Sequence, residues 1–80
     1  MRSDLSGQSK VVGAKQVRRA LEAGTAQVVL LADDADPRVT EPIVRLCEAQ
    51  SVGVERGYTM KDLGRACGLA VGSAVAALLA

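Results

Sequence analysis

The chain has 80 residues, of which 49% are hydrophobic and only 1% are aromatic, so we expect residues 1–80 to form one small domain with an aliphatic core. The scarcity of aromatic rings disfavours the stacking surfaces with which many proteins read single-stranded RNA. A formal net charge of +1 does not discriminate between partner classes, and the absence of histidine excludes Ser-His-Asp and Cys-His catalytic arrangements.

The first third of the chain predicts a short strand followed by an amphipathic helix. Arg2–Ser9 is either a short helix or a loose arm, and Lys10–Val12 is a brief strand. A helix is expected over about Ala14–Ala23, because apolar residues recur on one side at helical spacing and charged residues on the other. Gly24 follows where a left-handed cap residue would end that helix.

The middle of the chain predicts a buried strand and a second helix. Gln27–Ala32 is a continuous apolar run with β-branched members, as in a central strand covered on both faces. Aspartates at positions 33, 34 and 36 follow it and raise the question of a metal or catalytic site. No histidine or further carboxylate pattern completes one, which favours a turn with Asp36 as a helix cap and Pro37 in the first turn. Because Pro42 would break a helix interior, we expect the regular helix to begin near Thr40.

The last third predicts a strand, a short helix and a final strand. Ser51–Arg56 alternates between apolar and polar residues, as an edge strand with one solvated face would. Thr59–Asp62 resembles a capping box, and the helix that it begins ends at Gly68. Val75–Leu79 is expected to be a strand, although its alanines also permit a helix. Since strands alternate with helices, the fold class is α/β, with helices on both faces of one small sheet.

Neither the thiols nor the glycines suggest an enzyme. Cys47 and Cys67 fall on apolar helical faces, so we expect buried, unbridged thiols rather than nucleophiles or zinc ligands. Gly64 is expected to permit close helix packing, because no phosphate-binding or dinucleotide-binding loop is present. We therefore expect no cofactor and no catalysis. No apolar run is long enough to cross a bilayer and no signal-peptide core is present, so the expected location is the cytoplasm.

Two features stand out as candidate binding surfaces. Gly13 precedes a helix whose first turns carry Lys15, Arg18 and Arg19, and the free N–H groups of a helix start suit a phosphate. A basic helix face can also be merely solvated, and spacing alone leaves the two readings evenly matched. Leu69–Ser73 is mostly apolar although it is expected to be a loop, and apolar loops often touch a partner.

These features occur within a longer pattern that resembles the kink-turn-binding ribosomal proteins of the L7Ae and L30e type, most closely the short bacterial members. The resemblance covers nearly the whole chain and is carried by six motifs in the family's order. They are Gly13–Arg19, Val28–Leu31, Asp36-Pro37, Leu46–Glu48, Leu63–Gly68 and Val71–Ala74.

The resemblance implies a three-layer α-β-α sandwich with a small, mixed, four-stranded sheet. It also implies binding to a sharply bent RNA motif with tandem sheared G·A pairs. Lys15 and Gln16 stand where many archaeal and eukaryotic relatives have Asn-Glu, and both can still bond to guanine edges. Ala70 stands where relatives often carry Glu. The residues expected to contact RNA are Gly13, Lys15, Gln16, Arg18, Arg19, Leu69, Ala70, Val71, Gly72 and Ser73.

The leading hypothesis is therefore a monomeric, non-catalytic protein, ribosomal or ribosome-associated, that binds a kink-turn in rRNA or an mRNA leader and has no membrane partner. Two alternatives remain open. One is the accessory substrate-binding module of an RNA-modifying enzyme, and the other is a protein-interaction module that uses the apolar loop.

Overall fold

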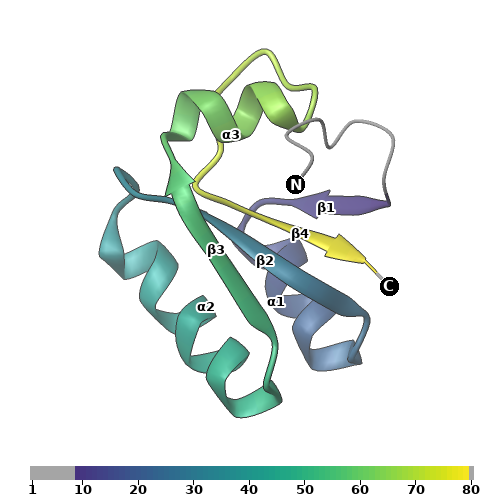
Figure 1. Ribbon diagram of the computed structural model, residues 1–80. Helices are drawn as coiled ribbons and strands as arrows, with labels where there is room; N and C mark the ends of the chain where they lie inside the picture. The colour runs from purple at the N-terminus through teal and green to yellow at the C-terminus, as the bar shows by residue number, and fades with distance from the viewer. Residues whose placement is uncertain (1–8, 80) are drawn as a thin grey trace.

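The computed structural model describes residues 9–79, and its strands form a single mixed sheet (Figure 1). The strands are β1 (Lys10–Val12), β2 (Ala26–Ala32), β3 (Gly53–Tyr58) and β4 (Val75–Leu79), in the spatial order β1-β4-β2-β3. Both β1 and β2 are antiparallel to β4, and β3 is parallel to β2. It follows that β1, β2 and β3 run in the same direction and finish at one end of the sheet, which we call the carboxyl end.

Three helices cover the two faces of this sheet, which confirms the predicted α-β-α sandwich. Helices α1 (Ala14–Ala23) and α2 (Pro37–Gln50) pack on one face, and α3 (Met60–Ala66) packs on the other (Figure 1). None of the helices in residues 9–79 has the length and apolar character that a bilayer crossing requires.

The central position of β2 explains the apolar run from Val28 to Ala32. Val29 and Leu31 lie in the core beneath α1 and α2, whereas Leu30 lies in the core beneath α3. All three side chains are at most 1% exposed. Where a strand is covered on both faces, successive side chains must be apolar, so the prediction of a doubly buried strand is confirmed for Val29–Ala32, whereas Gln27 near the start of β2 is exposed.

Helix α2 begins three residues earlier than predicted. Asp36 is its N-cap, with a side chain that accepts a hydrogen bond from the Arg38 N–H at 2.9 Å, and Pro37 is its first residue. Pro42 lies inside the helix instead of in its first turn. The prediction was wrong because Pro42 is exposed, so that water can hydrate the Arg38 carbonyl oxygen that an N–H at position 42 would have bonded.

The remaining boundaries follow from local capping. The structure starts β3 at Gly53 instead of Ser51, because Ser51 adopts a left-handed conformation with φ of 57° and ends α2. The edge position predicted for this strand is confirmed. Thr59 caps α3 by accepting a hydrogen bond from the Asp62 N–H at 3.0 Å. The helix or arm predicted over residues 2–9 lies outside the described residues, apart from Ser9.

Candidate functional site

The two segments selected from the sequence meet at the carboxyl end of the sheet. The first is the start of α1, and the second is the loop before β4. Strand β4 begins at this end of the sheet because it runs in the direction opposite to the other three strands. The Gly13 N–H donates to the Val75 carbonyl oxygen at 3.0 Å, and the Ala32 N–H donates to the Ala74 carbonyl oxygen at 2.9 Å. These two bonds place the loop between the start of α1 and the end of β2.

The start of α1 differs from the starts of the other two helices because no side chain caps it. Its N-cap is Gly13, with φ of 97°, a conformation that favours glycine. In contrast, Asp36 and Thr59 supply side-chain caps to α2 and α3. Among residues 9–79, the first-turn N–H groups of α1 therefore have no side-chain cap, which suits them to an anionic ligand.

The basic face of α1 is open to solvent. The buried residues of this helix are Val17, Ala20 and Leu21, as its amphipathic pattern predicts. The polar residues that the sequence selected on α1 are all exposed. They are Lys15, Gln16, Arg18 and Arg19.

The loop at 69–73 presents apolar side chains at the same end of the molecule. Val71 is 72% exposed and Leu69 is 39% exposed, and Ala70 and Gly72 are also exposed. Leu69 therefore does not turn into the core. Ser73 is only 7% exposed, and its hydroxyl donates to the Val75 carbonyl oxygen at 2.9 Å. The side chain of Ser73 thus stabilises the loop from inside instead of contributing to its surface.

Close packing on α3 fixes the position of this loop. A methyl group on Gly64 would overlap the Val71 carbonyl oxygen, and one on Gly72 would lie 3.2 Å from the Met60 carbonyl oxygen. The Ser73 N–H donates to that same Met60 oxygen at 3.0 Å. The expectation that Gly64 permits close packing is confirmed, and the segment packed against it is the candidate binding loop.

Asp34 supports the same arrangement, and the sequence reasoning did not single it out for this role. Its Oδ1 accepts a hydrogen bond from the Met60 N–H at 2.7 Å, across 26 positions of sequence. Asp33 similarly accepts from the Gly57 N–H at 3.3 Å. The aspartates after β2 therefore tie the α2, β3 and α3 segments together, and Asp36 is a helix cap as expected. In the sequence, only the position of these aspartates directly after a central strand indicates that they could hold segments together. Their hydrogen-bond partners, the N–H groups of Gly57 and Met60, are distant in the chain.

The reactive groups of the chain lie away from this surface or are already engaged. Cys47 is fully buried and Cys67 is 5% exposed, and burial raises the pKa of both thiols. Neither thiol is bridged, as expected. The Arg38 guanidinium lowers the pKa of the Asp36 carboxyl group. Within residues 9–79, no three His, Cys, Asp or Glu side chains gather as a metal site would require.

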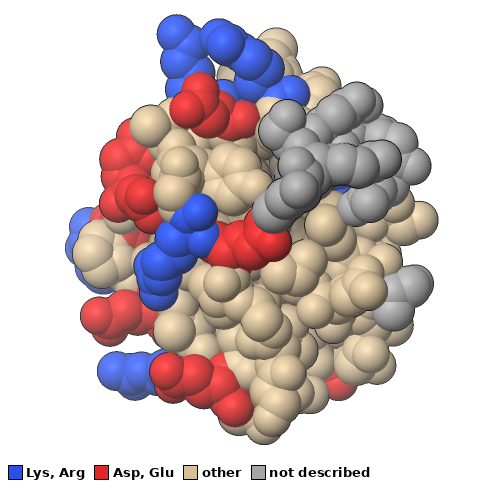
Figure 2. Space-filling model, viewed as in Figure 1, with Lys and Arg blue, Asp and Glu red and all other residues tan. Residues whose placement is uncertain are grey.

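The face of the sheet that carries α3 has a mixed charge pattern. Viewed as in Figure 1, with α1 behind the sheet, this face carries interspersed positive and negative side chains along its top and left side and toward its centre, and mostly neutral side chains at the lower right (Figure 2). No large surface of one sign faces this direction. The combination of an uncapped helix start, basic side chains and an exposed apolar loop is instead suited to a ligand with phosphates and a flat apolar group.

Comparisons with known proteins agree with this geometry. The model of the ribosomal protein L7Ae/L30e/S12e/Gadd45 family matches residues 5–79. An RNA-binding protein of Geobacillus sp. strain WCH70 is 41% identical over 69 residues, which are 86% of this chain and 84% of that protein. The large ribosomal subunit protein eL8 of Haloquadratum walsbyi is 34% identical over 68 residues, 84% of this chain and 57% of the relative.

Among solved structures, the Giardia lamblia 15.5kD RNA binding protein has a TM-score of 0.85 and 29% sequence identity. The similarity covers 90% of this chain and 61% of the longer Giardia chain. The same arrangement of helices and strands therefore occurs in a chain with a substantially different sequence.

Proposed function

The chain belongs to the ribosomal protein L7Ae/L30e/S12e/Gadd45 family, and from this premise we propose that it binds RNA at kink-turn motifs. The proposed site is the carboxyl end of the sheet, with the start of α1 and the loop at 69–72 as its two halves. The names of its relatives support the RNA part of the proposal, since the Geobacillus and Giardia proteins are both described as RNA-binding.

The observation that carries the proposal is the hydrogen bond from the Gly13 N–H to the Val75 carbonyl oxygen, 3.0 Å, because it holds the start of α1 against the first residue of β4, to which the loop leads. A kink-turn offers both phosphates and an extruded base within one compact bend, so a ligand of this kind requires a cationic element and an apolar one side by side. In our proposal α1 meets the G·A pairs and adjacent phosphates, while Val71 packs on the extruded base. The protein acts by binding alone, as the absence of histidine and the burial of both thiols favour.

Within α1 we assign different roles to two exposed side chains. Gln16 lies in the first turn, where its amide can both donate to and accept from base edges, so it contributes to the choice of motif. Arg19 lies one turn further along and contributes a phosphate contact, which strengthens binding to any RNA.

A gel shift with a kink-turn duplex and the same duplex without its bulge tests the proposal. The protein should prefer the kink-turn, Gln16→Ala should reduce that preference, and Arg19→Ala should weaken both complexes and lower the salt slope by about one. Equal binding of the unaltered protein to both duplexes would overturn kink-turn recognition. If Gln16→Ala and Arg19→Ala each weakened binding to both duplexes by the same factor, only the assignment of different roles to the two side chains would be wrong.

A further inference from the structure

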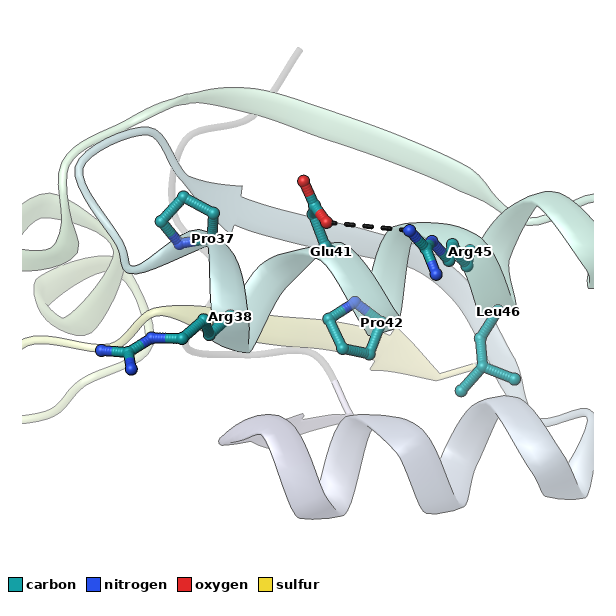
Figure 3. A pocket seen from close by; sticks show the side chains of 6 residues that line it. All are labelled: Pro37, Arg38, Glu41, Pro42, Arg45 and Leu46. Atoms are coloured by element: carbon teal, nitrogen blue, oxygen red, sulfur yellow. Dashed lines mark ion pairs between the residues drawn. The ribbon is translucent and has the colours of Figure 1, made fainter.

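A groove between α1 and α2 extends away from the proposed kink-turn site. It encloses about 330 Å³, and a second hollow of about 470 Å³ continues it along α2 and shares Arg38 and Pro42 with it. Pro42 and Leu46 point from α2 toward α1 along this path (Figure 3). The residues that line the first part, which we call the α1–α2 groove, are Ala14, Lys15, Arg18, Arg38, Val39, Pro42 and Ile43.

The charged residues that line the α1–α2 groove are all cationic: Lys15 and Arg18 from α1 and Arg38 from α2. Arg38 is paired with Asp36, its Nη2 lying 2.9 Å and its Nε 3.2 Å from Asp36 Oδ2. These bonds use one N–H of Nε and one of Nη2, so three of the five guanidinium N–H groups, two on Nη1 and one on Nη2, are left for another acceptor. The Arg38 side chain is 90% exposed, so an incoming anion can reach it.

We propose that the α1–α2 groove binds the phosphate backbone of a duplex stem that flanks the kink-turn, so that the RNA footprint continues from α1 onto α2. The proposal rests on the proposed function, because Lys15 and Arg18 connect the groove to that site. Three cations from two helices match the charge of a phosphate backbone. The groove offers no aromatic ring for stacking, and this favours the backbone of a duplex over an unpaired strand.

Arg38 is the residue that tests the groove separately, because it lies on α2 and outside the residues assigned to the kink-turn site. We compare a kink-turn with short stems and kink-turns in which each stem in turn is lengthened by about ten base pairs. Lengthening one of the two stems should tighten binding by the unaltered protein. Arg38→Ala should remove that gain, a loss of about two- to fivefold, and lower the salt slope for the lengthened RNA by about one. The affinity of the Arg38→Ala variant for the short kink-turn should equal that of the unaltered protein.

Arg45→Ala is the matched control, since it removes the same charge from the same helix. The Arg45 side chain is 81% exposed, and its Nη2 lies 3.9 Å from Glu41 Oε1. Arg45 lines the second hollow together with Glu41 (Figure 3) but does not line the α1–α2 groove, so its removal leaves the three cations of the groove in place. This variant should keep the gain from the longer stem. Circular dichroism of both variants would show that the fold is retained.

Three outcomes would overturn the proposal. The unaltered protein could bind no more tightly when either stem is lengthened, Arg38→Ala could still bind the longer RNA more tightly, or Arg45→Ala could lose this gain in affinity to the same extent as Arg38→Ala. If Arg38→Ala affects no RNA but abolishes binding of a poly-glutamate peptide, the groove takes an acidic protein segment and the RNA proposal is wrong. Failure of kink-turn recognition itself is a separate result, because it appears in the unaltered protein as equal affinity for bulged and unbulged duplexes.

Discussion

At the scale of single residues, Gly64 shows how a surface loop depends on a buried position. Gly64 lies in α3 and is itself buried, and the backbone of the loop at Val71 and Gly72 packs directly on its Cα. No side chain can occupy that space without displacing the loop. The position in which the loop exposes the Val71 side chain therefore depends on the absence of a side chain at Gly64, where the Val71 backbone packs.

Gly64→Ala tests this dependence, because two effects of the substitution predict opposite changes in the stability of the fold. Alanine stabilises an exposed helix interior by about 1 kcal/mol relative to glycine, but here the new methyl group would overlap the Val71 carbonyl oxygen. We expect the overlap to dominate, so the midpoint of urea unfolding should fall and RNA affinity should fall with it. An increase in stability with unchanged RNA affinity would show that the loop is not held against α3.

Single positions were predicted best where the cause is local. The left-handed conformation of Gly24, with φ of 75°, and the cap at Asp36 depend only on neighbouring residues, and both follow from the sequence. The burial of Ser73 and the long-range hydrogen bond of Asp34 depend on segments distant in the chain, so no local pattern indicated them.

At the scale of elements, α2 is the helix whose start the sequence misplaced. Pro42 predicts a helix start near Thr40 because an interior proline usually breaks a helix. Here the helix continues through it, because the buried side chains of Ile43 and Cys47 hold α2 on the sheet and the Arg38 carbonyl oxygen can meet water. Tertiary packing therefore outweighs the local cost of the proline.

The two prolines of α2 should respond oppositely to replacement. Pro42→Ala restores an N–H that can bond to the Arg38 carbonyl oxygen, which should stabilise the protein by about 1 kcal/mol after the greater freedom of the unfolded chain is subtracted. Pro37→Ala should destabilise it by about 0.5 kcal/mol, because proline suits the first helical position. Urea unfolding of the two variants measures both changes. Destabilisation by Pro42→Ala would mean that the ring contributes packing that the added hydrogen bond does not replace.

At the scale of the whole molecule, the sheet order joins segments that are more than 50 positions apart. Because β4 lies between β1 and β2, the loop before β4 emerges beside the start of α1. The element pattern in the sequence predicted the α/β class and most elements, and the family resemblance implied the sandwich. Hydrophobic periodicity alone could not predict the strand order, because many orders bury the same apolar faces.

The exposed loop of the proposed site is separate from the core. Val71 is 72% exposed and lies outside both core clusters, so its side chain contributes little to folding. Packed on an extruded base, the same side chain would remove apolar area from water at about 25 cal/mol per Å². Val71→Asp should therefore weaken kink-turn binding by about 1–3 kcal/mol and leave the thermal midpoint nearly unchanged. Calorimetry of binding and of unfolding measures the two quantities.

A second substitution at the same position separates lost contact from added charge. Val71→Ala removes most of the apolar contact without introducing a carboxylate, so it should weaken binding less than Val71→Asp and leave the salt slope unchanged. The base-packing role would be contradicted if Val71→Ala bound as tightly as the unaltered protein, because the effect of Val71→Asp would then be charge repulsion alone. A large fall in the midpoint for Val71→Asp would instead indicate that the loop contributes to folding, in which case the proposed site would be limited to α1.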